Sequence, residues 1–578
     1  MGVCDFVDEL NRLRKSSSDS IDNVMKFDDF KKYIHIQRTA EEDLKILLRE
    51  MKAVNHKKMI LLCGSAGDGK SHLLSYLKNA DEERLLDNYI IYNDATESNA
   101  PTKTAIQTLN ELLDGFADDN LNKPGESIIL AINLGVLSNF IESPEIGNRF
   151  KELNKYVGKN EILSSKISEN NIDKESIFQH ISFADYHMYT LTENGIKTDY
   201  IEEIFDRIFS DSEDNIFYQA YMRKISECPL AKKCPVKNNY EYLQEETNRK
   251  YVSHLLIQAI IKNKVVLTTR EILNYVYDIL VSSDFSFSRL YATMTNQSNF
   301  LKEYLKNITP TLMFDNGDVS ALMNTLREYD PLLIRNEKSD EMAITYNVSN
   351  NVKKMIVSEL DGTPYLNVIG EESAIDIIEQ SKNGLKSTLF SIMVRTKWGD
   401  LYEKYEDEYS SYLKDIYYFN TGKIPKLSSL YSKVENAVLG WCGMGEDKSI
   451  CLDDSHLQYA IYENVKFEPS LKNIPQQNED VELIRFVPRV IVGFKNQKDP
   501  ETDITLDIDY SLYHLICQLN NGYTQTADDR NNHADFMSFV DRILKAGTAD
   551  EKILIKGISN AEATLEKTSF GYKFRMVK

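Results

Sequence analysis

The N-terminal part of the chain shows apolar residues at helical spacing, followed by a short run that is apolar almost throughout. Residues 39–42 fit a helix-capping box. The apolar residues that follow recur on one helical face, at Leu44, Leu47, Leu48 and Met51. Residues 58–63 then read Lys-Met-Ile-Leu-Leu-Cys, which is typical of a strand buried on both faces of a parallel sheet. We therefore predict helices over residues 1–56 and a strand over 58–63.

Further strand-like runs alternate with helical patterns up to about residue 198. A helix is predicted over residues 71–79, and strands are predicted over 89–93, 127–133 and 180–191. Alternation of this kind favours a parallel sheet with helices on both faces. The predicted fold class is therefore α/β, with its core in residues 57–198.

The remaining sequence is first mostly helical and then mixed. We predict a helical lid over 199–333 and an α+β region over 334–578. Within the mixed region the pattern predicts helices near 371–382, 401–416 and 509–519, and strands over 457–467 and 483–494. Together with the N-terminal helical segment 1–56 and the core, this gives four parts, which suits a chain of 578 residues.

The segment between the first predicted strand and the next helix is a complete phosphate-loop motif. Its residues, with the one that follows, are Gly64, Ser65, Ala66, Gly67, Asp68, Gly69, Lys70, Ser71 and His72. Glycines allow backbone angles that turn several N–H groups toward a phosphate, and the following helix N-terminus adds a positive dipole end. In such loops the lysine reaches the β- and γ-phosphates, and the hydroxyl of the last residue coordinates Mg²⁺. We predict that the chain binds ATP and Mg²⁺ here; the alternative is a glycine-rich turn with Lys70 in solvent.

Hydrolysis of a nucleotide also needs an acidic residue near the metal ion. Two arrangements fit the sequence. In the first, strand 89–93 leads to Asp94 as a metal ligand with Glu97 nearby, and Asn133 on the next strand senses the γ-phosphate. In the second, 89–93 is an outer strand and Asn133 replaces the acid, which implies slow hydrolysis or a nucleotide switch. A third interpretation makes Asp94 and Glu97 ordinary turn residues.

Arg270 is a further candidate for the nucleotide site. It stands at the start of a predicted helix in the helical lid, after Thr268 and Thr269. The guanidinium group offers a fixed fork of donors that suits a γ-phosphate. The alternative is an ordinary amphipathic helix that one of the threonines caps.

Composition restricts the other possibilities. The formal net charge of −21 disfavours tight general binding to DNA. Basic stretches at 31–38, 232–237 and 395–397 fit solvated or partner-contacting surfaces better than nucleic-acid sites. No apolar run is long enough to cross a bilayer, and residues 1–15 lack the apolar core of an export signal. We therefore expect a cytoplasmic protein, in which the seven cysteines are reduced.

Two other kinds of site find little support. Cys228 and Cys234 are separated by five residues, which is wide for a zinc pair, and no second close pair of Cys or His accompanies them. No nuclease motif or nucleophilic triad stands out along the chain. We therefore expect no cleavage site in this protein itself.

Several local signatures resemble the DptF family, the P-loop component of the DNA phosphorothioation-dependent restriction system. They are spread over most of the chain, at residues 33–38, 61–74, 93–98, 129–137, 234–240, 267–274 and 512–523. For the core we predict a P-loop fold of the additional-strand class, similar to AAA+ proteins. The resemblance implies an accessory NTPase role beside DptG-like and DptH-like partners, in restriction of DNA that lacks the phosphorothioate mark. It carries over to Gly64, Gly69, Lys70 and Ser71 of the loop.

Two functions follow from these expectations. The first is an ATP-hydrolysing subunit of a restriction complex, in which partners contact the DNA and no membrane is involved. The second is a nucleotide-stabilised scaffold or switch without significant turnover, which the acidic surface and the weak signal for a metal-binding strand favour.

Overall fold

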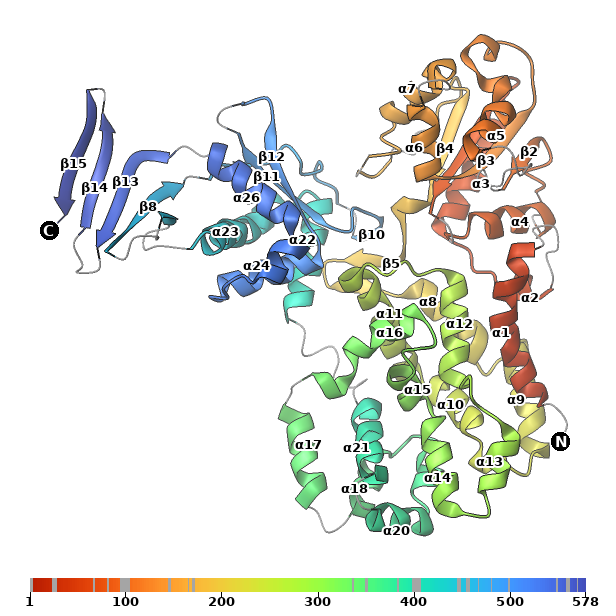
Figure 1. Cartoon of the computed structure of the whole chain (residues 1–578). Coiled ribbons are helices and arrows are strands. Elements are labelled where there is room, and N and C mark those ends of the chain that lie inside the picture. The colour runs from red at the N-terminus through yellow and green to blue at the C-terminus, as the bar shows by residue number, and fades with distance from the viewer. Residues whose placement is uncertain are drawn as a thin grey trace. The chain divides into compact units, whose positions relative to one another are not determined.

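The computed structural model places the chain in two compact units (Figure 1). The first unit comprises Met1–Thr190 and Thr198–Tyr405, and the second comprises Leu191–Lys197 and Glu406–Lys578. The first unit contains most of the first three predicted segments and part of the fourth. The division into four segments stays a prediction. The structure describes residues 4–22, 29–65, 68–80, 83–93, 104–143, 147–164, 166–168, 172–334, 337–348, 352–381, 384–397, 407–443, 449–453, 458–465, 467–479, 481–496, 499–546, 549–557, 562–568 and 570–577.

A four-stranded sheet lies in the first unit, and its described strands are all parallel. The order is β2-β3-β1-β4. The strands are β1 (Met59–Gly64), β2 (Tyr89–Tyr92), β3 (Ser127–Asn133) and β4 (Phe178–Ser182). Every residue of β1 is buried, as the continuous apolar run predicts. The predicted parallel sheet is therefore confirmed, and its central strand β1 leads into the phosphate-loop motif.

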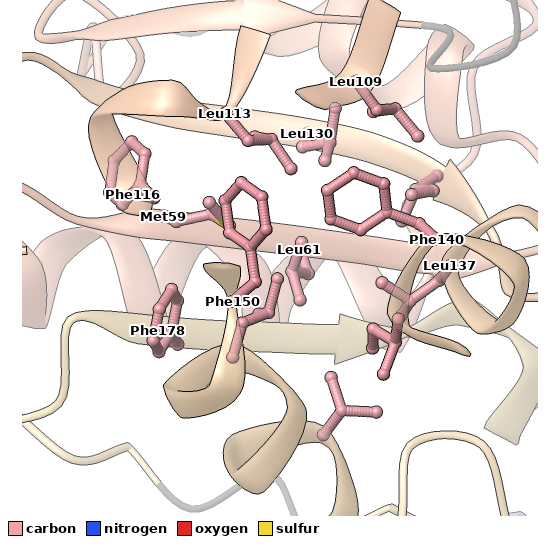
Figure 2. Close-up of a cluster of buried hydrophobic side chains, with 14 of the residues drawn as sticks. Met59, Leu61, Leu109, Leu113, Phe116, Leu130, Leu137, Phe140, Phe150 and Phe178 are labelled. Atoms are coloured by element: carbon pink, nitrogen blue, oxygen red, sulfur yellow. The ribbon is translucent and has the colours of Figure 1, made fainter. Parts of the chain in front are cut away.

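Helices cover both faces of this sheet, also as predicted. Alternate residues of each strand point to opposite faces and enter two separate cores. One core holds Leu61 and Leu130 with residues of α5 (Ala105–Leu112), α6 (Leu134–Glu142) and α7 (Lys151–Lys159) (Figure 2). The other holds Ile60 and Leu62 with residues of α3 (Thr39–Met51) and α4 (Lys70–Ala80). Burial on both faces fixes the position of the carboxyl end of β1.

Three local predictions are wrong. The predicted capping box at 39–42 does not form, because Arg38 is the N-cap residue of α3 and makes no side-chain cap, while Glu42 accepts a hydrogen bond from Gln37. The predicted strand 180–191 is two strands, β4 and β5 (Tyr186–Thr192), with a single helical turn between them.

The predicted strand 483–494 also divides, into β10 (Glu482–Arg485) and β11 (Val490–Lys495). Pro488 lies in the gap between the two strands. A proline has no N–H to donate, so it interrupts the ladder of hydrogen bonds.

From Thr198 on, the elements described in the first unit are helical, as predicted for 199–333. Before α3, the chain forms α1 (Asp5–Asp22) and α2 (Asp29–Tyr33). The others are α8 (Asp199–Phe209), α9 (Ile216–Glu227), α10 (Pro235–Gln244), α11 (Glu246–Asn263), α12 (Thr269–Leu280), α13 (Phe287–Thr293), α14 (Gln297–Lys306), α15 (Thr309–Asp315), α16 (Ala321–Leu326), α17 (Glu337–Val348), α18 (Val352–Glu359), α19 (Leu366–Ile369), α20 (Glu372–Gln380) and α21 (Gly384–Lys397).

The second unit mixes helices with antiparallel sheets. Its helices are α22 (Asp407–Asn420), α23 (Ile424–Trp441), α24 (Tyr510–Asn520), α25 (Ala527–Asn532) and α26 (Ala534–Ala546). One sheet has the order β12-β11-β9 and another has the order β15-β14-β13-β8-β7. Besides β10, β11 and the short β6 (Gly195–Lys197), the strands are β7 (Ser449–Asp453), β8 (Tyr459–Val465), β9 (Pro469–Ser470), β12 (Asp503–Ile508), β13 (Ala549–Gly557), β14 (Glu562–Thr568) and β15 (Gly571–Val577).

Within the part of the chain that the structure describes, no helix is both long enough and apolar enough to cross a bilayer.

Candidate functional site at the carboxyl edge of the parallel sheet

The phosphate-loop motif lies where β1 ends and α4 begins. Gly64 is the last residue of β1 and Lys70 is the first residue of α4. Gly64 pairs with Asn133 at the end of β3, and Cys63 pairs with Ser182 at the end of β4. The loop therefore lies at the carboxyl edge of the sheet, which is the usual location of ligand sites in open parallel sheets.

Hydrogen bonds within the motif hold the described part of the loop in a tight turn. The Ser65 N–H donates to the Asp68 carboxylate, and the Asp68 N–H donates to the Ser65 carbonyl over 3.4 Å. The Lys70 ammonium group turns back and donates to the same Ser65 carbonyl over 2.6 Å. The predicted ligands Ala66 and Gly67 lie outside the described residues.

Two glycines are required by this geometry. Gly69 has φ of +89°, which side-chain-bearing residues rarely adopt. A Cβ atom at Gly64 would lie 2.5 Å from Asp68 Oδ2 and 3.0 Å from the Cβ of Phe183. The loop thus depends on glycine for one backbone angle and for one close approach.

The charges of the loop are concentrated at Asp68 and Lys70. Their closest charged atoms are 4.0 Å apart. Burial raises the pKa of Asp68, and the cation of Lys70 only partly opposes that shift. Burial therefore makes the charged form of Asp68 less stable. An anion that approaches Lys70 competes with this carboxylate for the attraction of the ammonium group.

Ser71 and His72 occupy the first turn of α4, and both are exposed. His72 Nε2 lies 3.0 Å from Nδ1 of His35, whose ring stacks on Tyr76 at 3.6 Å between centroids. His35 in turn contacts the Glu41 carboxylate at 3.0 Å. His72 therefore belongs to a side-chain cluster beside the loop, as well as following it in sequence.

The polar residues predicted to handle metal and water are only partly described. Asp94 and Glu97 lie outside the described residues, although β2, the strand that leads to them, lies next to β3. Asn133 caps α6, since its side chain accepts a hydrogen bond from the Gly135 N–H over 2.9 Å. The strand order is compatible with both predicted arrangements, and the choice between them stays open.

Arg270 is an exposed residue in the first turn of α12. The helix begins at a capping box in which Thr268 accepts from the Glu271 N–H and Glu271 accepts from the Thr268 N–H. The ordinary amphipathic capped helix is therefore present. The role of Arg270 as a phosphate sensor stays a prediction.

Arg38 is a residue of the loop's surroundings that the sequence prediction missed. Its guanidinium Nη1 donates to the Asp68 carbonyl over 2.8 Å. A Cβ atom on Gly69 would lie 3.7 Å from the same nitrogen. The residue stands 30 positions before Asp68, so no local motif connects it to the loop. In the sequence it stands out only as part of the signature 33–38 and of the basic stretch 31–38.

The described residues suit an anion better than a metal cluster. Backbone N–H groups, the α4 N-terminus and Lys70 are the components that bind phosphate groups in such loops. Ser71 offers one hydroxyl oxygen, of the kind that Mg²⁺ accepts. In the parts of the chain that the structure describes, no group of three or more His, Cys, Asp or Glu side chains is placed to hold a metal ion.

The chain was also compared with known proteins. Searches with protein-family models, with curated proteins and with solved structures each gave no match.

Proposed function

We propose that this chain binds ATP together with Mg²⁺ at the loop from Gly64 to Ser71, and that it is a P-loop NTPase of the additional-strand class, similar to AAA+ proteins. One observation carries the proposal most directly. The complete motif lies between a fully buried central parallel strand and a helix that begins at Lys70. The motif combines this position with the positive φ of Gly69 and the close packing at Gly64. A glycine-rich turn without a function would not need all three features.

The residues of the loop have separate roles in this proposal. The N–H groups and the α4 N-terminus orient the phosphates, and Lys70 exchanges its contact with the Ser65 carbonyl for the β- and γ-phosphates. The Ser71 hydroxyl and the Asp94 carboxylate would hold Mg²⁺, which would supply positive charge beside the phosphates. Glu97, Asn133 and Arg270 are the candidates for orienting water or sensing the γ-phosphate.

The biological setting in the proposal is a bacterial restriction complex. The support for it is the resemblance of seven sequence segments to DptF proteins. In this setting ATP binding changes contacts with DptG-like and DptH-like partners in the cytoplasm, and those partners contact the DNA. The net charge of −21 supports this division of labour, since an acidic chain repels the phosphate backbone.

A second candidate function is a nucleotide-stabilised scaffold with little turnover. The observation in its favour is the state of Asn133, the residue that pairs with Gly64 across the sheet. It is an amide instead of a carboxylate, and its side-chain oxygen is already engaged in capping α6. If Asn133 stands in the position of the acid, ATP binds but is hydrolysed slowly.

A phosphate-release assay separates the two functions. Mg-ATP hydrolysis is measured for the unaltered chain, for Lys70→Ala and for a matched control, Lys78→Ala, which removes an exposed lysine from the same helix. Each is assayed alone, with unmodified DNA, and with candidate partner subunits.

We expect turnover by the unaltered chain and by Lys78→Ala under at least one of these conditions, and none by Lys70→Ala. Turnover that survives in Lys70→Ala would contradict the assignment of this site. Binding of ATP without turnover under every condition would select the scaffold function.

A further inference from the structure

Arg38 makes contacts on two sides, and on one of them it contacts the phosphate loop. The residue is half-buried between α2 and α3, with an extended backbone. Nη1 donates to the Asp68 carbonyl over 2.8 Å, and Nη2 donates to the Tyr186 carbonyl over 3.5 Å. Because both acceptors are backbone carbonyls, the position of the guanidinium group depends on the main chain of the loop at Asp68 and of β5 at Tyr186.

On its other side Arg38 contacts the helical part of the first unit. Its guanidinium carbon lies 5.4 Å from the centre of the Tyr200 ring, in a cation–π contact. Tyr200 belongs to α8, and its hydroxyl lies 2.7 Å from the Thr269 hydroxyl. Thr269 is the first residue of α12, immediately before Arg270. Three consecutive contacts thus connect the loop to the start of α12.

Arginine is suited to such a double contact. Its planar group presents donors along its edge and can lie on an aromatic face at the same time, whereas lysine is a single point charge on a flexible stem. The in-plane donors fix the Asp68 and Tyr186 carbonyls relative to each other. A shift of the Asp68 main chain therefore changes where the guanidinium plane meets Tyr200.

We propose that Arg38 is a positioning residue that couples the phosphate loop to α12 through Tyr200 and Thr269. This inference rests on the proposed function, because it requires a phosphate ligand at the loop. It adds a specific consequence: ligand binding at Lys70 alters the stability of the first turns of α12. A ligand can do this only if it interacts differently with the two states of the element, and Arg38 supplies that difference.

Hydrogen exchange with and without Mg-ATP tests the coupling. Amide exchange is followed over 272–276 of α12 for the unaltered chain, Arg38→Ala, Arg38→Lys and Tyr200→Leu. The matched control is Arg49→Ala, which removes an exposed arginine that pairs with Glu83 on the surface. Affinity is measured separately for each protein by titration with a fluorescent ATP analogue, so that ATP is present at about 100 times the Kd.

In the unaltered chain and in Arg49→Ala, we expect ATP to slow exchange in α12 about tenfold, a size typical of the coupling between two linked sites. Arg38→Ala and Tyr200→Leu bind ATP but lose this slowing, and Arg38→Lys restores only part of it. Equal slowing in Arg38→Ala at saturation would overturn the coupling alone. Failure of the unaltered chain to bind the analogue would overturn the proposed function and the coupling together.

Discussion

Gly64 is the residue at which sheet and loop constrain each other most. It closes the buried strand β1 and lies under the Asp68 carboxylate, the side chain of Phe183 and the Lys70 ammonium group. The motif in the sequence indicates glycine here because of the phosphate. The structure adds a second reason, which is that the side chains of the loop fill the space that a Cβ atom would need.

Substitution of Gly64 by alanine tests this close approach. We expect Gly64→Ala to destabilise the protein by about 1–3 kcal/mol and to weaken nucleotide binding, because the loop must move away from the new methyl group. Gly158→Ala in α7 is the control, since a Cβ atom there meets nothing within 4 Å. That change should be neutral or stabilise by up to about 1 kcal/mol. Equal effects of the two substitutions on chemical denaturation would contradict the argument.

At the scale of elements, much of the sheet could be predicted because strong local signals coincide with tertiary burial. The run at 58–63 is apolar on both faces, and residues 127–133 repeat that pattern, so both strands are found within a residue or two of their predicted positions. The signal was weaker where local chemistry competes with tertiary contacts. Thr39 has the character of a capping residue, yet α3 begins after Arg38, whose side chain makes no cap and donates instead to the distant Asp68 carbonyl.

The candidate site was predictable only as far as it is continuous in sequence. Lys70 and Ser71 follow from the motif, but Arg38, Tyr200 and Thr269 come from three segments that only the fold brings together. Nothing in the spacing of these residues indicates their contact. Long-range polar contacts of this kind are the part that sequence patterns miss.

The packing of α1 on α12 buries a carboxyl group, which makes the stability of the folded protein depend on pH. Asp278 of α12 is buried, and its Oδ1 is 3.7 Å from Arg14 Nη1 of α1. Burial raises the pKa of Asp278 from 3.8 to about 6, and Arg14 only partly opposes this. Because the pKa of Asp278 is higher in the folded state than in the unfolded state, the protonated carboxyl group contributes fully to stability below about pH 4. This contribution is lost as the pH rises through about 6.

Asp278→Asn should therefore stabilise the protein at neutral pH. We expect a gain of about 1–3 kcal/mol at pH 7.5, since the amide carries no charge to desolvate, and no gain at pH 3.5. Denaturant unfolding at both pH values measures it, with the exposed Asp284→Asn as the control. A gain of the same size at both pH values would show that the charge of Asp278 is not the cause.

At the scale of the whole molecule, the chain has two compact units, and the loop lies in the first. The second unit carries antiparallel sheets and no part of the phosphate-loop motif. A ligand at the loop should therefore stabilise the first unit directly. This division makes the response of unfolding to nucleotide a test of where the site lies.

The most direct test of the central claim is thermal unfolding with and without Mg-ATP, for the unaltered chain, Lys70→Ala and Lys78→Ala. At about 100 times the Kd, ATP should add about 2.7 kcal/mol to the free energy of unfolding of the unaltered chain. We predict this stabilisation for the unaltered chain and for Lys78→Ala, and its loss in Lys70→Ala, which stays folded without ATP. Absence of any stabilisation of the unaltered chain, or equal stabilisation of Lys70→Ala, would contradict the proposal that this loop binds ATP.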